Sequence, residues 1–200
     1  MPVDVFIRIA PRHPVRESLA RAVAMRWVME MDVKMHAILG GATRQAVEIG
    51  DIIGDMEVLA IENFAWTSRR YAEEQAAGDL YILADDDHLI LGKDWVKRAI
   101  TAAEQNPGYG ILAARSVIQT ERFGGNETEV IPHPYVGCPC VIRRGAVDYR
   151  KLQSPANQQD GTLCDAMRAA GFETGFIRGL DYNHLGHGFS QVEPVLWMRY

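Results

Sequence analysis

Apolar residues in the first half of the chain follow two kinds of spacing in turn. Leu19, Val23, Trp27 and Met31 recur every four positions, which predicts a helix with one apolar face. Residues 80–84 are apolar throughout, as expected for a strand that is buried on both faces of a sheet. The same alternation predicts strands at residues 4–9, 33–39, 57–61 and 80–84, and helices at residues 14–31, 43–49, 66–77 and 93–105.

Alternation of strands and helices is typical of an α/β fold with a mostly parallel central sheet. Ligands bind beyond the carboxyl ends of the strands in such sheets. The loops at those ends are residues 10–14, 40–44, 62–66 and 85–92. After Gly108 the pattern changes, and it predicts strands at 111–118, 136–143 and 174–178, a polar hairpin or mobile loop at 121–134, and a helix at 160–170.

Composition narrows the function classes. The 200 residues suit one domain, and a formal net charge of −5 provides no overall basic field for nucleic acid. No apolar run is long enough for a transmembrane segment, and the start of the chain reads as a strand rather than a signal peptide, which predicts a cytoplasmic protein. The three cysteines, Cys138, Cys140 and Cys164, are interpreted as reduced thiols in or near the core.

The clearest chemical signal is the run Asp85, Asp86 and Asp87, which follows a buried strand. Three adjacent carboxylates repel one another unless a positive group lies among them. Mg²⁺ or Mn²⁺ prefers carboxylate oxygens and bridges them to diphosphate oxygens, so a metal site is one interpretation. A solvated acidic turn that leads into a helix is the other.

The segment before this run resembles glycosyltransferase family 2, whose members have the GT-A fold. Residues in register with the family pattern are Asn63, Arg70, Ala76, Gly78, Asp79, and the D-x-D pair Asp85 and Asp87. Ala65 and Tyr71 depart from it, since the family usually has Gly and Asn there. The resemblance implies a GT-A-like three-layer sandwich, with a nucleotide-sugar-binding half at 1–108 and an acceptor-side half at 109–200. It also implies Mn²⁺ or Mg²⁺ as cofactor and a nucleotide-diphosphate sugar as donor.

The second half adds a candidate base. Gln159 and Asp160, followed by Leu163, Arg168 and Gly171, resemble the family segment E-D-x-x-L-x-x-R-x-x-x-G. In inverting members this aspartate is the general base that takes the proton of the acceptor hydroxyl, a role that needs a carboxylate. Asp160 is also a natural helix N-cap, which is the simpler interpretation.

The resemblance implies further site residues. His184 is expected to join Asp85 and Asp87 at the metal, and His187, Arg143 and Arg144 are expected to contact phosphate or acceptor. Donor contacts are expected at Pro11, Arg12, Asn63, Arg70, Asp85 and Asp86. Each of these residues has a simpler alternative, such as a solvated arginine pair or a polar contact in a glycine-rich loop.

The sequence therefore predicts a metal-dependent, hexosyltransferase-like enzyme that moves a sugar onto an acceptor hydroxyl with inversion. A non-catalytic sugar-nucleotide-binding module is one alternative. A nucleotidyltransferase is another, although the first strand is not followed by the glycine-rich phosphate loop of those enzymes. A saccharide is the favoured acceptor, and a modified DNA base, a lipid-linked sugar or a protein side chain stays open.

Overall fold

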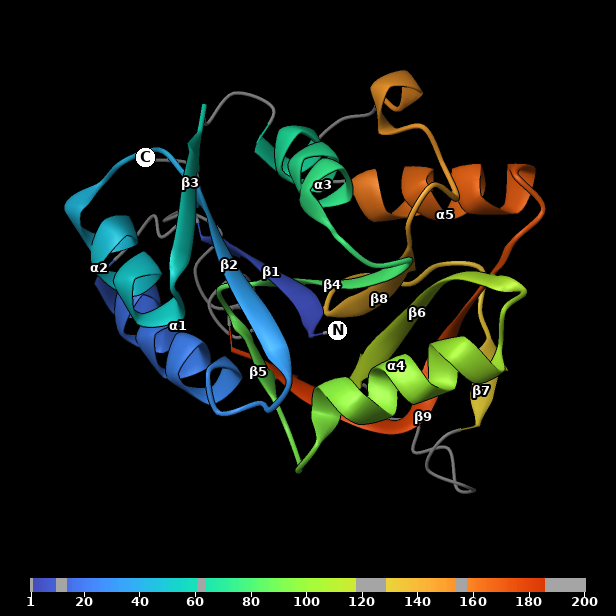
Figure 1. Cartoon of the computed structure of the whole chain (residues 1–200), viewed down its shortest axis with the longest axis horizontal. Coiled ribbons are helices and arrows are strands. Elements are labelled where there is room, and N and C mark those ends of the chain that lie inside the picture. Colours follow the sequence, from blue (N-terminus) through green and yellow to red (C-terminus); the bar gives the residue numbers. More distant parts are fainter. Residues whose placement is uncertain (1, 10–13, 61–63, 118–128, 154–157, 186–200) are drawn as a thin grey trace.

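The computed structural model describes residues 2–9, 14–60, 64–117, 129–153 and 158–185. The first half alternates strands and helices as predicted (Figure 1). Its elements are β1 (Val3–Ile9), α1 (Pro14–Trp27), β2 (Val33–Gly40), α2 (Arg44–Ile53), β3 (Asp55–Leu59), α3 (Phe64–Gln75), β4 (Leu80–Asp85), β5 (His88–Ile90) and α4 (Trp95–Gln105). The second half contains β6 (Tyr109–Ser116), β7 (Val130–Pro132), β8 (Cys140–Arg143), a short 3₁₀ helix (Tyr149–Lys151), α5 (Gln159–Ala169) and β9 (Glu173–His184).

All the strands join one sheet. Their order is β3-β2-β1-β4-β8-β6-β9-β5, and β7 pairs with β9 beside this path. Strands β1, β2, β3, β4, β6 and β9 run in one direction, while β5, β7 and β8 run in the other. The expected α/β fold with a mostly parallel central sheet is confirmed.

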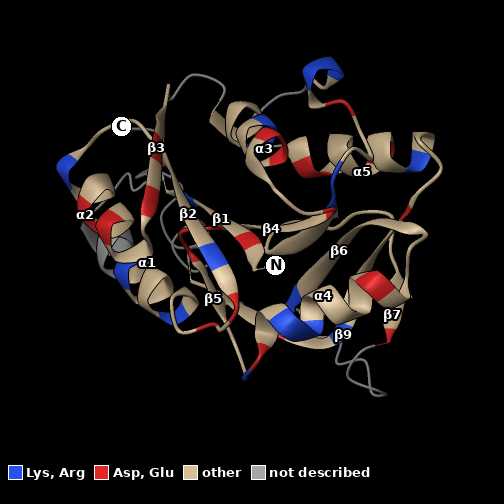
Figure 2. Cartoon of the chain, in the orientation of Figure 1, with Lys and Arg blue, Asp and Glu red and all other residues tan. Residues whose placement is uncertain are grey.

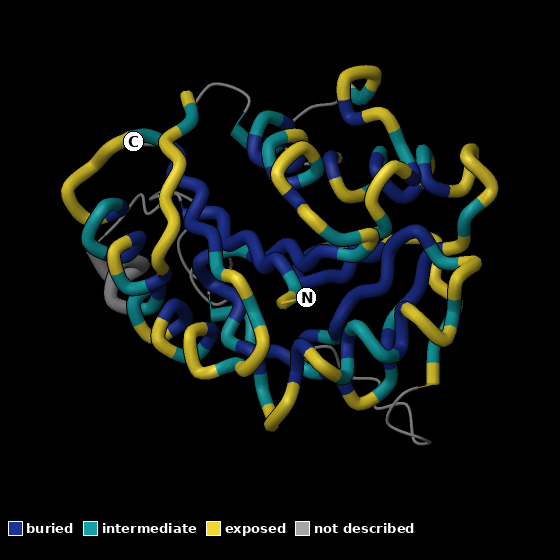
Figure 3. Tube along the Cα trace, viewed as in Figure 1, coloured by how far each residue is buried: buried dark blue, intermediate teal, exposed yellow. Residues whose placement is uncertain are grey.

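Two apolar cores lie on the two faces of this sheet, so the molecule has three layers. Side chains of α1, α2 and α4 pack on one face, where Trp27 and Trp95 are fully buried. Side chains of α3 and α5 pack on the other face, around Phe6 and Tyr81. The central strands are accordingly buried along most of their length, whereas the edge strand β3 is mostly exposed (Figure 3).

Charged side chains lie mainly outside these layers. Acidic and basic positions occur on the same helices, α3 and α5 (Figure 2). This distribution agrees with the absence of an overall basic field in the composition. In the part of the chain described, none of the helices combines the length and the apolar character that crossing a membrane would require.

The structure differs from the sequence prediction around one pair of strands. The short strand β5 was not predicted, and β9 extends to His184, well beyond the strand expected at 174–178. These two strands pair with each other, with His88 opposite His184. Three residues are too few to show a periodic pattern, so β5 becomes a strand only through its partner.

Candidate active site

The carboxyl ends of β1 and β4 meet at the point where the sheet order reverses. The chain continues from β1 to β2 and β3 on one side, whereas β4 lies on the other side of β1. Ligands of open α/β sheets bind at such a switch point. Arg8 of β1 is the register partner of Asp85 of β4, and the Asp86 N–H donates to the Arg8 carbonyl at 3.0 Å. The aspartate run thus begins at the ligand-binding edge that the sequence predicted.

Asp87 and His184 come together at this edge. The His184 Nε2 lies 3.3 Å from the Asp87 Oδ2, although the two residues are far apart in the sequence. On the other side of the same carboxylate, the His88 Nε2 lies 3.5 Å from Oδ1. One ligand atom from each of these residues lies within 4.8 Å of the other two. Asp87 and His88 are buried, and His184 is partly exposed.

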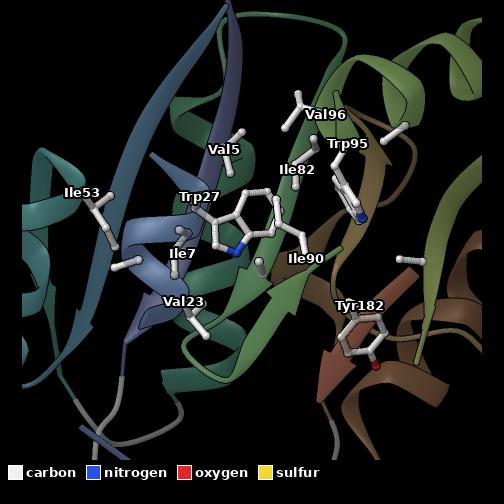
Figure 4. Packing of buried hydrophobic residues seen from close by; sticks show 14 of the residues in the cluster. Val5, Ile7, Val23, Trp27, Ile53, Ile82, Ile90, Trp95, Val96 and Tyr182 are labelled. Carbon is white, nitrogen blue, oxygen red and sulfur yellow. The ribbon is translucent and has the colours of Figure 1, made fainter. Parts of the chain in front are cut away.

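Two tryptophans hold the strands that carry these histidines. The Trp27 indole N–H donates to the His88 carbonyl at 3.2 Å, and the Trp95 indole N–H donates to the Asp181 carbonyl at 3.1 Å. The two rings meet edge to face, with centroids 5.3 Å apart. Figure 4 shows both tryptophans in the packed core beside Ile90 of β5. The first core therefore fixes the position of the histidine pair.

His88 is held in one tautomer. Its Nδ1 accepts a hydrogen bond from the Asp85 N–H at 3.1 Å, and a backbone amide can only donate. Burial lowers the pKa of His88, although Asp85 and Asp87 oppose this effect, so the ring is neutral near pH 7. A neutral ring whose Nδ1 accepts carries its hydrogen on Nε2, which faces Asp87. His88 therefore supports the Asp87 carboxylate, and His184, whose Nε2 lies 3.3 Å from the Asp87 Oδ2, is the imidazole that could offer a lone pair to a metal.

Asp87 and His184 fit a divalent metal ion. Ligand atoms about 2.1 Å from a metal and adjacent in its coordination shell lie about 3 Å from each other. The 3.3 Å separation of Asp87 Oδ2 and His184 Nε2 is close to that spacing. A mixed carboxylate and imidazole set suits Mn²⁺ better than Mg²⁺, which prefers oxygen ligands alone.

Asp85 is paired with an arginine rather than with the histidines. The Arg8 Nη2 lies 2.6 Å from the Asp85 Oδ1, and Arg8 is only 8% exposed. Burial by itself would raise the pKa of Asp85, but the Arg8 guanidinium and His88 outweigh it and the pKa is lowered. Asp85 is therefore ionised at neutral pH and is stabilised by a fixed positive charge.

Asp160 lies in the first turn of α5 and is not the N-cap of that helix. The N-cap position is Gln158, which makes no side-chain cap hydrogen bond. Asp160 instead accepts a hydrogen bond from the Nη2 of Arg69, a fully buried residue of α3. The same guanidinium also donates to the Ala65 carbonyl at 3.0 Å. Asp160 itself is 53% exposed, so a buried arginine holds a carboxylate that remains open to solvent.

Electrostatic effects connect Asp160 with the aspartate run. Burial raises the pKa of the Tyr182 phenol, and the negative charges of Asp85, Asp87 and Asp160 raise it further. Asp160 and Asp85 also both raise the pKa of Arg8 against the lowering effect of burial. Because such effects weaken with distance, Tyr182 lies within electrostatic range of all three carboxylates.

Several other residues that the sequence predicted for the site do not join these carboxylates. Arg70 is on the exposed face of α3, and its neighbour Arg69 is the one that reaches Asp160. β8 runs antiparallel to β4, which puts Arg143 beside Leu80, at the opposite end of β4 from Asp85. There Arg143 donates to backbone carbonyls of α4 and β6.

The neighbouring Arg144 lies at the same end of the sheet, where its N–H donates to the Asp79 carbonyl at 2.9 Å. Asp86 is buried within the aspartate run. Four predicted contacts, Pro11, Arg12, Asn63 and His187, lie outside the described residues.

Sequence reasoning missed Arg8, Arg69 and His88. Arg8 had a usable signal, because a charged residue between apolar residues of a strand is rarely buried without a partner. His88 directly follows the aspartate run, but its role depends on the pairing of β5 with β9. Arg69 could not be told from Arg70, because adjacent residues of a helix point about 100° apart and only packing decides which one faces inward.

Comparison with known proteins finds similarity in structure but not in sequence. No sequence profile of a known protein family matches the chain, and no curated protein matches it in sequence. Its structure is similar to that of residues 1–349 of S. aureus TarS, with a TM-score of 0.61, 14% identity, and coverage of 98% of this chain and 64% of the other.

Two further TarS structures are also similar. The complex of the same fragment with UDP-GlcNAc gives a TM-score of 0.63 at 13% identity, over 94% of this chain and 61% of the other. A crystal structure of TarS gives 0.57 at 15% identity, over 98% of this chain and 39% of the other. The chain thus spans less than two thirds of the TarS chains that it resembles. The resemblance seen in the sequence is confirmed at the level of the fold: the chain has a GT-A-like fold, similar to that of S. aureus TarS.

Proposed function

We propose that the chain transfers a sugar from a nucleotide-diphosphate sugar to an acceptor hydroxyl, with inversion at the anomeric carbon. The observation that carries this proposal is the pairing of Asp87 with His184 at the switch point of the sheet, together with Asp160 held nearby by Arg69. The GT-A-like fold supports the same assignment. UDP-GlcNAc, the ligand in one of the TarS structures, is a reasonable first donor to test.

In this proposal Asp87 and His184 hold Mn²⁺. When bound, the ion neutralises the charge of the donor diphosphate and stabilises the nucleoside diphosphate as it leaves. Asp85 and Arg8 form a fixed ion pair beside the proposed metal position. His88 keeps the Asp87 carboxylate in place through its Nε2–H.

Asp160 acts as the general base. Its exposed carboxylate accepts the proton of the acceptor hydroxyl as that oxygen attacks the anomeric carbon. Arg69 fixes the orientation of the carboxylate through a charge-assisted hydrogen bond. A non-catalytic binding module would have no need for an exposed carboxylate anchored in this way, so the Asp160–Arg69 pair favours an enzyme.

The test is a screen of nucleotide sugars with and without Mn²⁺. We expect one donor to stabilise the protein thermally in the presence of Mn²⁺, and to release its nucleoside diphosphate when a suitable acceptor is added. Pools of saccharides and hydroxymethylated DNA would serve as acceptors. Excess EDTA should abolish both effects.

Two variants make the screen specific. Asp87→Asn should remove Mn²⁺-dependent turnover and leave the fold intact. Asp55→Asn is a matched control, because Asp55 is an exposed residue of the edge strand β3 and pairs only loosely with Lys34 at 3.5 Å. Full turnover by Asp87→Asn, or by wild type in EDTA, would contradict the proposal.

A further inference from the structure

The two aspartates of the D-x-D pair have different kinds of partner. Asp85 pairs with Arg8 through Nη2 and Oδ1, 2.6 Å apart, and Arg8 is more than nine-tenths buried. A guanidinium keeps its proton at any physiological pH, so this partner never releases the carboxylate by losing its charge. The same Nη2 lies 3.5 Å from the Sγ of Cys138, a weak acceptor, and the buried Arg8 Nε has no hydrogen-bond partner among the described residues. Asp85 is therefore the strongest partner that the structure describes for Arg8.

Asp87, by contrast, is held by imidazoles. His184 and His88 lie 3.3 and 3.5 Å from its two oxygens. A neutral imidazole binds a carboxylate only weakly, and the same ring can itself be a metal ligand. Asp87 thus lies against two groups that are themselves metal ligands, whereas Asp85 lies against a fixed positive charge.

Asp85 is nevertheless close enough to reach a metal ion at this site. Its Oδ2 lies 3.9 Å from the His88 Nε2, the same nitrogen that faces Asp87. The group of mutually close ligand atoms nevertheless consists of Asp87, His88 and His184, without Asp85. The Asp85 carboxylate is instead held against Arg8, and this pairing is the feature that keeps it apart from the group.

We propose that Arg8 is a positioning residue that keeps Asp85 out of the metal coordination shell, so that the ion is bound through Asp87 and His184. This inference rests on the proposed metal dependence of the site. It assigns the D-x-D pair two separate tasks: Asp87 binds the cation, and Asp85 is a fixed anion neutralised by the protein. It also has an unusual consequence, because loss of Arg8 should strengthen metal binding.

The reason is electrostatic. Without Arg8 the site gains one unpaired negative charge within a few ångströms of Asp87, and a carboxylate oxygen is a good ligand for a hard divalent cation. The freed Asp85 can then rotate toward the ion as an additional ligand. The same change leaves a carboxylate unbalanced at the place where the donor diphosphate binds, so donor affinity should fall while metal affinity rises.

The experiment measures the affinity for Mn²⁺ alone, by electron paramagnetic resonance of the free ion, without donor or acceptor. Arg8→Met should bind Mn²⁺ at least about tenfold more tightly than wild type, and Asp87→Asn at least about tenfold more weakly. Asp85→Asn leaves the Arg8 charge unbalanced but removes no ligand, so it should weaken Mn²⁺ binding clearly less than Asp87→Asn does. The double variant with Arg8→Met and Asp85→Asn should return to the wild-type affinity, because the carboxylate that Arg8 restrains is gone.

Arg8→Lys is the matched control, because a lysine keeps the positive charge and should keep the wild-type Mn²⁺ affinity. Circular dichroism and thermal unfolding would establish that each variant is folded. If Arg8→Met does not fold, Arg8→Gln takes its place with the same expected results, because glutamine also removes the positive charge.

Several results would overturn the inference. If the Asp85→Asn variant loses Mn²⁺ as completely as the Asp87→Asn variant does, Asp85 is a metal ligand. Weaker Mn²⁺ binding by the Arg8→Met variant than by wild type would also contradict the proposal. Either result would leave the proposed sugar transfer standing. A wild-type protein that binds no Mn²⁺ would overturn this inference together with the metal dependence in the proposed function.

Discussion

Asp160→Asn tests whether the carboxylate of α5 is a base or only an anchor for Arg69. The substitution keeps the shape of the side chain and an oxygen that can accept from the Arg69 guanidinium, but it removes the basicity. If Asp160 is the general base, kcat should fall by about 10²–10⁴-fold. Donor affinity should change little, because the proposed donor contacts lie at the aspartate run.

The effect on stability can be worked out from the same contact. Arg69 is 2% exposed and keeps its hydrogen bond to the Ala65 carbonyl, so it is not left without partners. Replacing a charge-assisted hydrogen bond by a neutral one costs about 1 kcal/mol, the difference between the typical values for the two kinds. For a chain of this size that corresponds to a fall in Tm of about 2–4 °C. The rate and the stability should therefore respond on very different scales.

The assay combines initial rates at saturating donor with a thermal melt of each protein. Asp165→Asn is the matched control, because Asp165 is in the same helix, is mostly exposed and pairs with Arg168 one turn away. It should change neither the rate nor the Tm appreciably. Transfer by Asp160→Asn at close to the wild-type rate would show that Asp160 only anchors Arg69. A rate loss accompanied by a comparably severe loss of Tm would instead point to a structural role.

Three further predictions concern the residues around these carboxylates. Trp27→Phe removes the donor to the buried His88 carbonyl and should lower the free energy of unfolding in urea by about 1–3 kcal/mol; an unchanged midpoint would contradict the assigned hydrogen bond. Gly137→Ala places a Cβ 2.8 Å from the Asp160 Oδ2, so we expect a displaced carboxylate and a fall in kcat of up to about 100-fold with little change in Tm. Burial lowers the pKa of His88, so the unfolded chain takes up this proton at higher pH than the folded protein does. Stability should therefore fall as the pH decreases below about 6.5, and His88→Asn should flatten that decrease in thermal melts from which metal is absent.

Much of the first half could be predicted because its signals are local. Strand β4 is an apolar run, and the aspartates follow it directly, so their place at the ligand-binding edge follows from the rule for parallel sheets. Residues 14–27 form a helix within the predicted segment. The residues of the second half were harder to assign, because the directions of its strands depend on pairing. Arg143 lies at the end of β8 away from the aspartates since β8 is antiparallel to β4.

By itself, then, the sequence determined the α/β alternation, the position of the aspartate run and the candidate base Asp160. The tertiary structure alone decided which side chains are partners of these carboxylates. Arg8, Arg69 and His88 become their partners through strand register, the rotation of a helix about its axis and the pairing of β5 with β9. Each of these is set by packing between distant segments, which a local pattern of apolar and polar residues does not record.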